Sequence, residues 1–507
     1  MVPNASPVSL SIAASTEDII QVIAASLKDH RIEVRPQTVQ IRGLWDSLDW
    51  RIASTGMDLE SRVTAGSNQA EIYLLPPREY GQRGTLYVDA GSDFALPSAI
   101  SPTGLGNRVS KLTSGRAILR VAEFEVSFTE VLIFDDLNKH VGTIEIDLVS
   151  ELHQTWIRLR PKRGYESDLA RALVAVTAYG SSLATMDSSV DLWRAILWLR
   201  GRRRFDYSAG FHVPLDGSMG YEVALGKLLA YLLAAAKRNL DGLFRDIDTE
   251  FAHEFRVATR RARSLIAAAE SNLRGEVARP LRRRLGEAAA MAGDLRDLDV
   301  ALEEIPHISW LNTPEVVGKI NKLRQASLEA LRSYLEGESL NSTLEDWSSL
   351  ALQLIISDPT DQPPLGERAA FQLEGSRRRM VKLASDSRTH TDAERLHALR
   401  KSAKQLRYLL EAYSSIIDQK AASLSISDMK VLQDYLGKLQ DRATLAALLD
   451  QLKIESVDQS IFEIPDGVET ALAHFISPSA SRHWVALISS IKRQPNSGNK
   501  AKHRRGL

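Results

Sequence analysis

The sequence predicts two domains of different class: an α+β domain built on an antiparallel sheet, followed by an all-α helical bundle. Two observations carry this prediction. The chain has 507 residues, which is too long for a single ordinary hydrophobic core. Its hydrophobic pattern also changes, from a period of two before about residue 160 to the helical period of about 3.6 from roughly residue 165 onward.

Short segments with alternating or β-branched residues fill the first part of the chain. They read TVQIRG (38–43), QAEIYLL (69–75), GTLYVDA (84–90), ILRVAEFEVSFTEVLIF (118–134), VGTIEIDLV (141–149) and TWIRLRP (155–161). Turn formers such as PPREYGQRG and DDLNKHVG separate them, as hairpins require, and GLGN at 104–107 predicts only a turn. One helix is expected before these strands, near TEDIIQVIAASLKD.

Helical periodicity then runs to the end of the chain, as in GKLLAYLLAAAKRNLDGLF and EVARPLRRRLGEAAAMAGDL. The stretch GRRRFDYSAGFHVPLDGSMG is rich in Gly and polar residues and has no periodicity, which indicates a linker. The sequence therefore predicts an α+β domain at 1–205, a linker at 206–217, a helical domain at 218–492 and a basic disordered tail at 493–507.

Composition excludes several classes of site. The chain has no cysteine, which removes disulfides, thiolate metal sites and cysteine nucleophiles. No apolar run approaches the roughly 20 residues that cross a bilayer, and the first residues lack a signal pattern, so a soluble cytoplasmic protein is expected. Because the formal net charge is zero, any anion site must come from the placement of charges rather than from bulk attraction.

A histidine followed by cations occurs twice in the helical half, in HEFRVATRR and in HALRKSAKQLR. Each copy spaces its four residues at steps of three, four and three. The first stripe is His253, Arg256, Arg260 and Arg263, and the second is His397, Arg400, Lys404 and Arg407. At about 100° per residue, each set falls within roughly 80° of arc on one helix face.

The offset of 144 residues between the two stripes continues beyond them. It also carries Gly293 onto Gly437 and Asp297 onto Asp441. A shared offset over about 45 residues indicates an internal two-fold repeat of a helical unit.

The stripes carry charge that their own helices do not compensate. No Asp or Glu occurs between Glu254 and Glu270, or between Glu394 and Glu411. A run of charges is usually a solvated helix face, but such faces mix signs, with acids three or four residues from the bases. Like charges on one face repel, so we expect an outside anion to neutralise them, and arginine forks match phosphate oxygens.

Other basic clusters would extend this site if they line the same cavity, although each by itself is typical of an ordinary surface run. The predicted anion-binding residues are His253, Arg256, Arg260, Arg261, Arg263, His397, Arg400, Lys401, Lys404, Arg407, Arg238, Arg282, Arg283, Arg378, Arg379 and Lys382. Two histidines at matching positions favour phosphate contact over simple packing. A metal is not indicated, because HExxH and any carboxylate or cysteine cluster are absent from the sequence around them.

Four segments, HEFRVATRRARSLIAA, GDLRDLDV, RLHALRKSAKQLRYLLEAY and VLQDYLGKLQD, resemble in order the signature segments of the CHAD domain. This is the conserved histidine α-helical domain, and the resemblance covers about residues 218–490. It implies a helical bundle of two pseudo-symmetric halves whose basic face binds inorganic polyphosphate. It further implies that the eight stripe residues contact phosphate, and that the protein is found at polyphosphate granules.

The first half is similar to a CYTH domain, the triphosphate tunnel fold, over about residues 7–200. LWDSLDWRIASTGMDLESR is similar to the aspartate-containing segment of that family and to the glycine before its LRxR strand. GTIEIDLV is similar to its late acidic strand. Such domains often precede a CHAD domain, and the resemblance implies a barrel-like antiparallel sheet.

Departures from the CYTH pattern bear on catalysis. The ExExK strand of the family would fall on SLSIA, which has no acid and no lysine, and Glu60 and Arg62 stand where LRxR has two arginines. Glu145 and Asp147 remain as vestigial metal candidates, but two carboxylates without an opposing set make a poor metal site. We therefore expect no metal, no cofactor and no hydrolysis by metal-assisted attack of water.

The predicted function is binding of inorganic polyphosphate in a basic channel of the helical domain, with a catalytically inactive N-terminal domain. The alternative is a metal-dependent inorganic triphosphatase or polyphosphatase of the CYTH type, which the missing ExExK strand disfavours. Nucleic acid is disfavoured as a specific ligand, because its readout needs base-edge contacts or stacking aromatics and aromatic residues total 6%. No membrane partner is expected, and the sequence leaves open a homodimer and the length of polyphosphate preferred.

Overall fold

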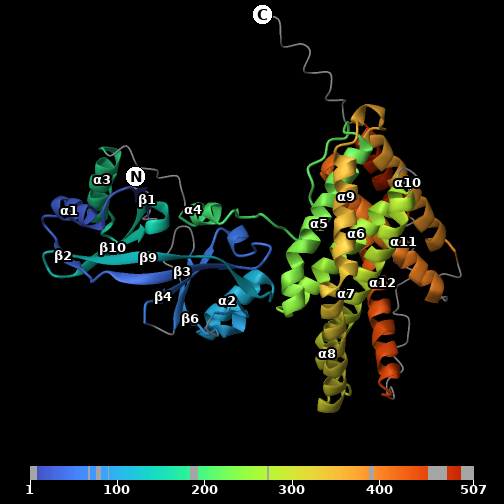
Figure 1. Cartoon of the computed structure of the whole chain (residues 1–507), viewed down its shortest axis with the longest axis horizontal. Coiled ribbons are helices and arrows are strands. Elements are labelled where there is room, and N and C mark those ends of the chain that lie inside the picture. The colour runs from blue at the N-terminus through green and yellow to red at the C-terminus, as the bar shows by residue number, and fades with distance from the viewer. Residues whose placement is uncertain are drawn as a thin grey trace, which may run out of the picture. The chain divides into compact units, whose positions relative to one another are not determined.

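The computed structural model of the chain divides into two compact units, Met1–Ser208 and Ala209–Leu507. The first contains a β-sheet with helices, and the second is helical (Figure 1). The described helices include none that is long and apolar enough to span a membrane. The basic tail expected at 493–507 lies outside the described residues, which are 8–66, 69–75, 82–88, 91–182, 192–270, 273, 275–386, 393–454 and 477–492.

The first unit is built on one sheet whose paired strands are all antiparallel, with the order β1-β11-β10-β9-β3-β4-β5-β6-β8, and with β2 and β7 also paired to β9. All six segments expected to be strands overlap strands of this sheet, which confirms that part of the prediction. The strands are β1 (Val8–Ile12), β2 (Arg31–Val34), β3 (Thr38–Asp46), β4 (Asp58–Thr64), β5 (Ala70–Leu75), β6 (Gln82–Leu86), β7 (Phe94–Ala95), β8 (Ile100–Ser101), β9 (Ile118–Phe134), β10 (His140–Val149) and β11 (Gln154–Pro161).

The sheet is open, which corrects the expectation of a barrel-like domain. Among the described strands, β1 and β8 stand at the two ends of the order and do not pair with each other. The 17-residue β9 takes β3 and β2 along one edge, and β10 and β7 along the other. The last strand, β8, has only two residues, so it offers too few backbone groups for a closing ladder.

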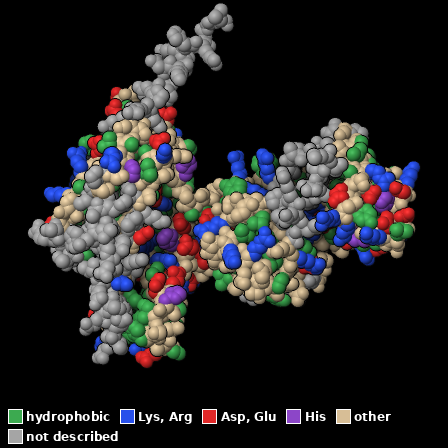
Figure 2. All heavy atoms as spheres, turned by 180° about the vertical axis from the view of Figure 1, so that it is seen from behind, with side chains coloured by type: hydrophobic (Ala, Val, Ile, Leu, Met, Phe, Trp, Pro, Cys, Tyr) green, Lys and Arg blue, Asp and Glu red, His purple; other side chains and the backbone are tan. Residues whose placement is uncertain are grey.

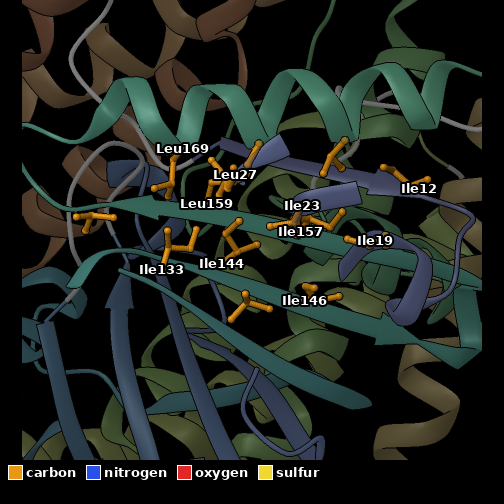
Figure 3. Close-up of a cluster of buried hydrophobic side chains, with 14 residues drawn as sticks. Ile12, Ile19, Ile23, Leu27, Ile133, Ile144, Ile146, Ile157, Leu159 and Leu169 are labelled. Atoms are coloured by element: carbon orange, nitrogen blue, oxygen red, sulfur yellow. The ribbon is translucent and has the colours of Figure 1, made fainter. Parts of the chain in front are cut away.

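Helices α1 (Thr16–Ser26) and α3 (Glu166–Ser182) cover one face of the sheet (Figure 3). Ile19 of α1 and Leu169 of α3 pack with Ile144 of β10 in one buried apolar cluster. Each fully buried side chain of this kind contributes about 1.5–3 kcal/mol of transfer free energy. The helix expected before the strands is α1, as predicted.

A helix that the sequence did not predict is α2 (Thr103–Thr113), which contains the GLGN segment expected to be a turn. One of the two glycines there, Gly106, serves close packing, whereas a Cβ on Gly104 would meet open space. A Cβ on Gly106 would lie 2.7 Å from the carbonyl oxygen of Pro97, so only glycine allows this approach of backbones. The two glycines gave this segment the composition of a turn, although it is helical and needs Gly106 where Pro97 approaches.

The second unit contains long helices throughout its described part, as the periodicity predicted. Helix α6 packs against α5 and α7, and α11 packs against α10 and α12. The two stripes thus lie on the middle helices of two similar three-helix successions, while the duplication itself stays a prediction. The bounds are α5 (Tyr221–Arg245), α6 (Thr249–Ala269), α7 (Gly275–Glu304), α8 (Pro314–Glu336), α9 (Glu338–Ile355), α10 (Leu365–Ala384), α11 (Ala393–Ala412), α12 (Gln419–Gln451) and α14 (Pro478–Lys492).

The segment 201–220, expected to be a linker, forms neither helix nor strand. Its apolar side chains are nevertheless buried at Phe211, Val213 and Leu215. The hydroxyl of Tyr231 donates a hydrogen bond to the carbonyl oxygen of Gly210 at 2.6 Å. The second part of this segment is therefore packed on the helical unit rather than free of it.

Candidate anion-binding site

The first stripe lies on α6, whose start is fixed by Asp248. The carboxylate of Asp248 accepts hydrogen bonds from two backbone N–H groups of the first turn, at 2.9 and 3.3 Å. Phe255, Ala262 and Leu265 are buried on the apolar face of this helix. That burial sets the rotation of α6, and the stripe follows along the border of its buried face, with His253, Arg256 and Arg260 half-buried and Arg263 exposed.

The second stripe lies on α11 and is placed by the same kind of packing. Leu399, Ala403 and Leu406 are fully buried and anchor one face of the helix. Their spacing of three and four residues leaves the stripe beside that face. Arg400, Lys404 and Arg407 are half-buried, whereas His397 is exposed.

Helices α6 and α11 contact each other in the helical unit, and this contact brings the two stripes together (Figure 1). Burial lowers the pKa of Lys404 on α11, and the charges of Arg260 and Arg256 on α6 lower it further. The guanidinium of Arg261 on α6 also donates hydrogen bonds to the Glu411 carboxylate of α11, at 2.6 and 3.1 Å. The cations of both stripes therefore share one electrostatic site.

Three of these cations have no partner in the part of the chain that the structure describes. Arg260 and Arg263 from α6, and Lys404 from α11, make no hydrogen bond or ion pair with any described residue. Burial and the surrounding cations lower the pKa of Lys404 from 10.5 to about 7, and burial also lowers that of Arg260. Positive charges that are close together and unpaired create a strong local attraction for an anion.

Other cations of the two helices are balanced by acids. The guanidinium of Arg256 donates a hydrogen bond to Asp297 of α7 at 3.2 Å. Arg407 forms an ion pair with Glu411 at 3.2 Å, so one carboxylate holds both Arg407 and Arg261. These acids hold the cations in place and reduce, without removing, the positive charge of the site.

The two aspartates of the GDLRDLDV segment have different surroundings. Asp297 forms an ion pair with Arg256 and so helps to orient it. Asp299 is buried and accepts a hydrogen bond from Arg324 of α8 at 2.7 Å. Arg324 also donates to Asp246 at the end of α5, so this pair of acids ties α5, α7 and α8 together beside the site.

Two glycines of α7 lie against arginines of the first stripe, and only one of them was noted in the sequence. A Cβ on Gly286 would lie 3.5 Å from Nη1 of Arg263, and a Cβ on Gly293 would lie 3.5 Å from Nη1 of Arg256. Both distances are ordinary van der Waals contacts, so the two glycines lie directly against the arginines and an alanine would still fit. The signal that could have found Gly286 is its spacing of seven residues from Gly293, inside a helix where glycine costs about 1 kcal/mol relative to alanine.

The outlying basic clusters differ from the stripes in exposure and pairing. Arg282 forms an ion pair with Glu270 at 2.7 Å, and Arg283 forms one with Glu287 at 3.0 Å. Arg282 is therefore already balanced by Glu270, which directly follows α6, and Arg283 by Glu287 of α7. The remaining predicted residues of this group are exposed, namely Arg238, Arg378, Arg379, Lys382 and also Lys401 of α11.

The histidine of the first stripe, His253, is half-buried and lies near other charged groups. Burial lowers the pKa of His253, and the neighbouring Arg296 and Arg256 lower it further against the opposing charge of Glu250. Its imidazole is therefore neutral at neutral pH and can donate or accept a hydrogen bond.

Within the described ranges, no group of three or more His, Cys, Asp or Glu side chains could hold a metal ion.

A second charged cluster is formed by side chains from four strands of the sheet of the first unit. Arg42 donates from both terminal nitrogens to Asp147, at 2.5 and 2.6 Å, and Arg62 donates to Glu60 at 2.7 Å. Trp193 also donates to Glu60, at 3.2 Å. The members of this cluster come from β3, β4, β10 and β11, and are Arg42, Glu60, Arg62, Glu145, Asp147, Arg158 and Arg160.

The vestigial metal candidates belong to this cluster and face guanidinium groups. Glu145 forms ion pairs with Arg160 at 2.9 Å and with Arg158 at 3.5 Å, and Asp147 forms one with Arg158 at 3.2 Å. Burial opposes the charged form of Glu145, but Arg62 and the other arginines outweigh it and lower its pKa to about 2. The lone pairs that a divalent cation would need are used by arginines.

The face of the chain drawn in Figure 2 carries both basic and acidic side chains. Basic and acidic side chains are interspersed over the visible faces of both units (Figure 2). This distribution agrees with the formal net charge of zero. The unpaired cations of α6 and α11 are therefore a local feature of the helical unit.

Comparison with known proteins identifies the helical part of the chain. Residues 227–450 match the family model of the CHAD domain. This range contains α6, α7 and α11, and with them both stripes. The sheet of the first unit lies outside the match. A search of the curated proteins found no match.

Solved structures also show likenesses to the chain. The CHAD domain from the plant Ricinus communis is 20% identical, with a TM-score of 0.44, covering 56% of this chain and 96% of that one. PptA from Streptomyces chartreusis is 16% identical, with a TM-score of 0.34, covering 55% and 99%. A protein from Vibrio parahaemolyticus, provisionally assigned as an adenylate cyclase, is 14% identical, with a TM-score of 0.24, covering 38% and 99%.

Proposed function

We propose that this chain, which carries a CHAD domain at residues 227–450, binds inorganic polyphosphate at the stripes of α6 and α11. One observation carries the proposal. Arg260, Arg263 and Lys404 stand together on two contacting helices without a hydrogen bond or ion pair to any described residue. Holding such charges together costs free energy in the free protein, and a bound polyanion offsets that cost.

The spacing of the cations favours a linear chain of phosphates over a single phosphate. From Arg256 to Arg263 the first stripe advances seven residues, which is about 10 Å along a helix at 1.5 Å per residue. A single phosphate cannot reach both ends of this stripe and Lys404 on the neighbouring helix. A polyanion with a charge on every unit can contact them all, and Arg forks supply bidentate hydrogen bonds.

Nucleic acid offers phosphates too, but specific recognition of its bases needs stacking or base-edge contacts. Tyr408 is buried, and the ring of Phe255 is also buried, so neither is free to stack on a base. The site therefore supplies phosphate contacts without a base-reading surface. Single-stranded DNA is therefore not expected to displace bound polyphosphate at matched phosphate concentration.

We further propose that the N-terminal unit has no triphosphatase activity. Glu145 and Asp147 are neutralised by arginines, and SLSIA brings no acid or lysine to β1. The test is to incubate the full chain with tripolyphosphate and Mg²⁺ or Mn²⁺ and to measure released phosphate. Release above that of an Asp147→Asn variant would establish the metal-dependent alternative.

The experiment for binding measures fluorescently labelled long-chain polyphosphate against the purified full chain across a series of salt concentrations. Single-stranded DNA is the competitor, at matched phosphate concentration. We expect tight binding that weakens with salt and that DNA does not displace. Absence of binding, or equal displacement by any polyanion, would contradict the proposal.

Location and assembly follow as parts of the same proposal. A polyphosphate-binding protein is expected to gather at polyphosphate granules, which a fluorescent fusion can test in cells with and without polyphosphate. The repeated stripe is proposed to come from a duplication within one chain. Whether the protein forms a homodimer is measured by light scattering with and without polyphosphate.

A further inference from the structure

Lys404 has an unusual setting among the cations of the site. It is half-buried, and the four charges that act on it most are all positive: Arg260 and Arg256 on α6, and Arg400 and Arg407 on α11. No described carboxylate forms an ion pair with it. Helices α10 and α12 also pack against α11, and the described side chains of these two helices supply none of these four charges.

This setting penalises the ammonium form of the side chain. Burial removes water from the charge, and the arginines repel it, so the pKa of Lys404 falls from 10.5 to about 7. Above this pH the free protein holds Lys404 mostly neutral. An anion placed against the amine would reverse the balance, because it supplies a negative partner that no described residue provides.

We infer that Lys404 takes up a proton when a polyanion binds to the stripes, so that occupancy of the site depends on pH near neutrality. This inference rests on the proposed function. The proton uptake adds a cost to binding at any pH where the free lysine is neutral. Affinity should therefore fall about tenfold for each pH unit above roughly pH 7, and stay level below it.

The comparison of the two stripes supplies the control within the chain. Lys404 occupies the position that Arg260 occupies in the first stripe, since both follow their histidine by seven residues. Arginine stays charged in proteins at every pH of interest and cannot take up a proton in this range. Lys404→Arg therefore makes the second stripe like the first and should remove the pH dependence.

Two histidines also lie on these helices. His253 is already neutral near pH 7 because its pKa is lowered by burial, and His397 is exposed on α11. Both histidines are retained in Lys404→Arg, and the polyphosphate added to that variant has the same end groups. Any proton exchange that comes from them persists in that variant, and the difference from the natural chain isolates Lys404.

The experiment is titration calorimetry of the full chain with long-chain polyphosphate, in two buffers of different ionisation enthalpy. The dependence of the measured heat on the buffer counts the protons taken up. At about pH 8 we expect uptake approaching one proton per site in the natural chain, and less than half of that at about pH 6. Lys404→Arg should take up no more than the background of the histidines and end groups, and so should Lys404→Met.

The outcomes separate the two proposals. Binding at about pH 6 without extra uptake by the natural chain at about pH 8, relative to Lys404→Arg, overturns the proton coupling and leaves polyphosphate binding standing. Equal uptake in the natural chain and in both variants overturns it as well. Absence of binding at either pH overturns the proposed function, and the coupling with it.

Discussion

The two charged clusters of the molecule use the same kinds of side chain but balance them in opposite ways. Inside the sheet, four arginines face three carboxylates, and Arg42 and Asp147 are fully buried as a pair. On α6 and α11, Arg260, Arg263 and Lys404 have no described partner. A charge that is fully buried in the protein needs an opposite charge from the protein itself. A charge that a ligand can reach can instead be neutralised when the ligand binds.

The pKa values show the same contrast. In the sheet, burial opposes ionisation of Glu60, but Arg62, Arg158 and Arg42 outweigh burial and lower its pKa to about 2. In the helical unit, burial and neighbouring cations act in the same direction, and the pKa of Lys404 falls to about 7. The surroundings thus favour the charged forms of Glu60 and Glu145 in the first cluster, and disfavour the charged forms of Lys404 and Arg260 in the second. This difference distinguishes a structural ion network from a candidate binding site.

The largest expected effect is on binding, in Arg260→Gln combined with Lys404→Gln. Hydrogen bonds to charged groups contribute about 1.5–3 kcal/mol each, so polyphosphate affinity should fall between about 10²- and 10⁴-fold. The matched control is Arg282→Gln with Arg283→Gln, which removes the same formal charge from residues paired with Glu270 and Glu287. If both double variants lose affinity equally, the site is a matter of net charge alone.

The next effect is on stability, in Asp147→Asn. This change leaves Arg42 buried with one charged partner fewer, and breaking a buried pair in this way costs about 3–5 kcal/mol. Urea unfolding followed by tryptophan fluorescence should report it, because Trp156 and Trp193 are buried in the first unit. Asp136→Asn, at an exposed position, is the control. A loss of polyphosphate affinity in Asp147→Asn would contradict the separation of the two clusters.

Strong acid should weaken the first unit, because its buried carboxylates pair with arginines only when they are charged. The folded pKa values of Glu60 and Glu145 are about 2, below the ordinary 4.5, so their contribution to stability is complete above about pH 4.5. It is lost as the pH falls toward 2, because protonation breaks their pairing with the arginines. Thermal unfolding between about pH 5 and pH 2 should show this loss. Asp147→Asn, already lacking one acid, should start from lower stability over the same range.

The smallest expected effect distinguishes a positioning arginine from one that contacts the ligand. Arg261 was predicted to bind the anion, but it is held by Glu411 across α6 and α11. Arg261→Gln should lower the unfolding free energy by about 1.5–3 kcal/mol, the range for a hydrogen bond to a charged group. The dependence of log affinity on log salt should keep its slope, whereas Arg260→Gln should reduce the slope by about one. A reduced slope in Arg261→Gln would place that residue among the ligand contacts.

Much of the architecture could be predicted because it depends on local patterns. The six strand segments and the long helices follow from hydrophobic periods, and each stripe follows from residues that are three or four positions apart on one helix. The predictions that were wrong concern features with distant causes. Gly106 in helix α2 is needed where the carbonyl oxygen of Pro97 approaches it, and closure of the sheet would depend on pairing of β1 with β8, which are far apart in the chain.

The sequence shows which residues form the two stripes and that no acid lies between Glu254 and Glu270 or between Glu394 and Glu411. Glu411 nevertheless pairs with Arg407, which precedes it by four residues on α11. Which cations stay without an acid partner among the described residues depends on how the helices pack. Asp297 reaches Arg256 from another helix, and Glu411 takes Arg261 from across the contact of α6 with α11. Spacing along a helix is a property of neighbouring residues, but an ion pair between helices depends on packing and rotation, which no local pattern contains.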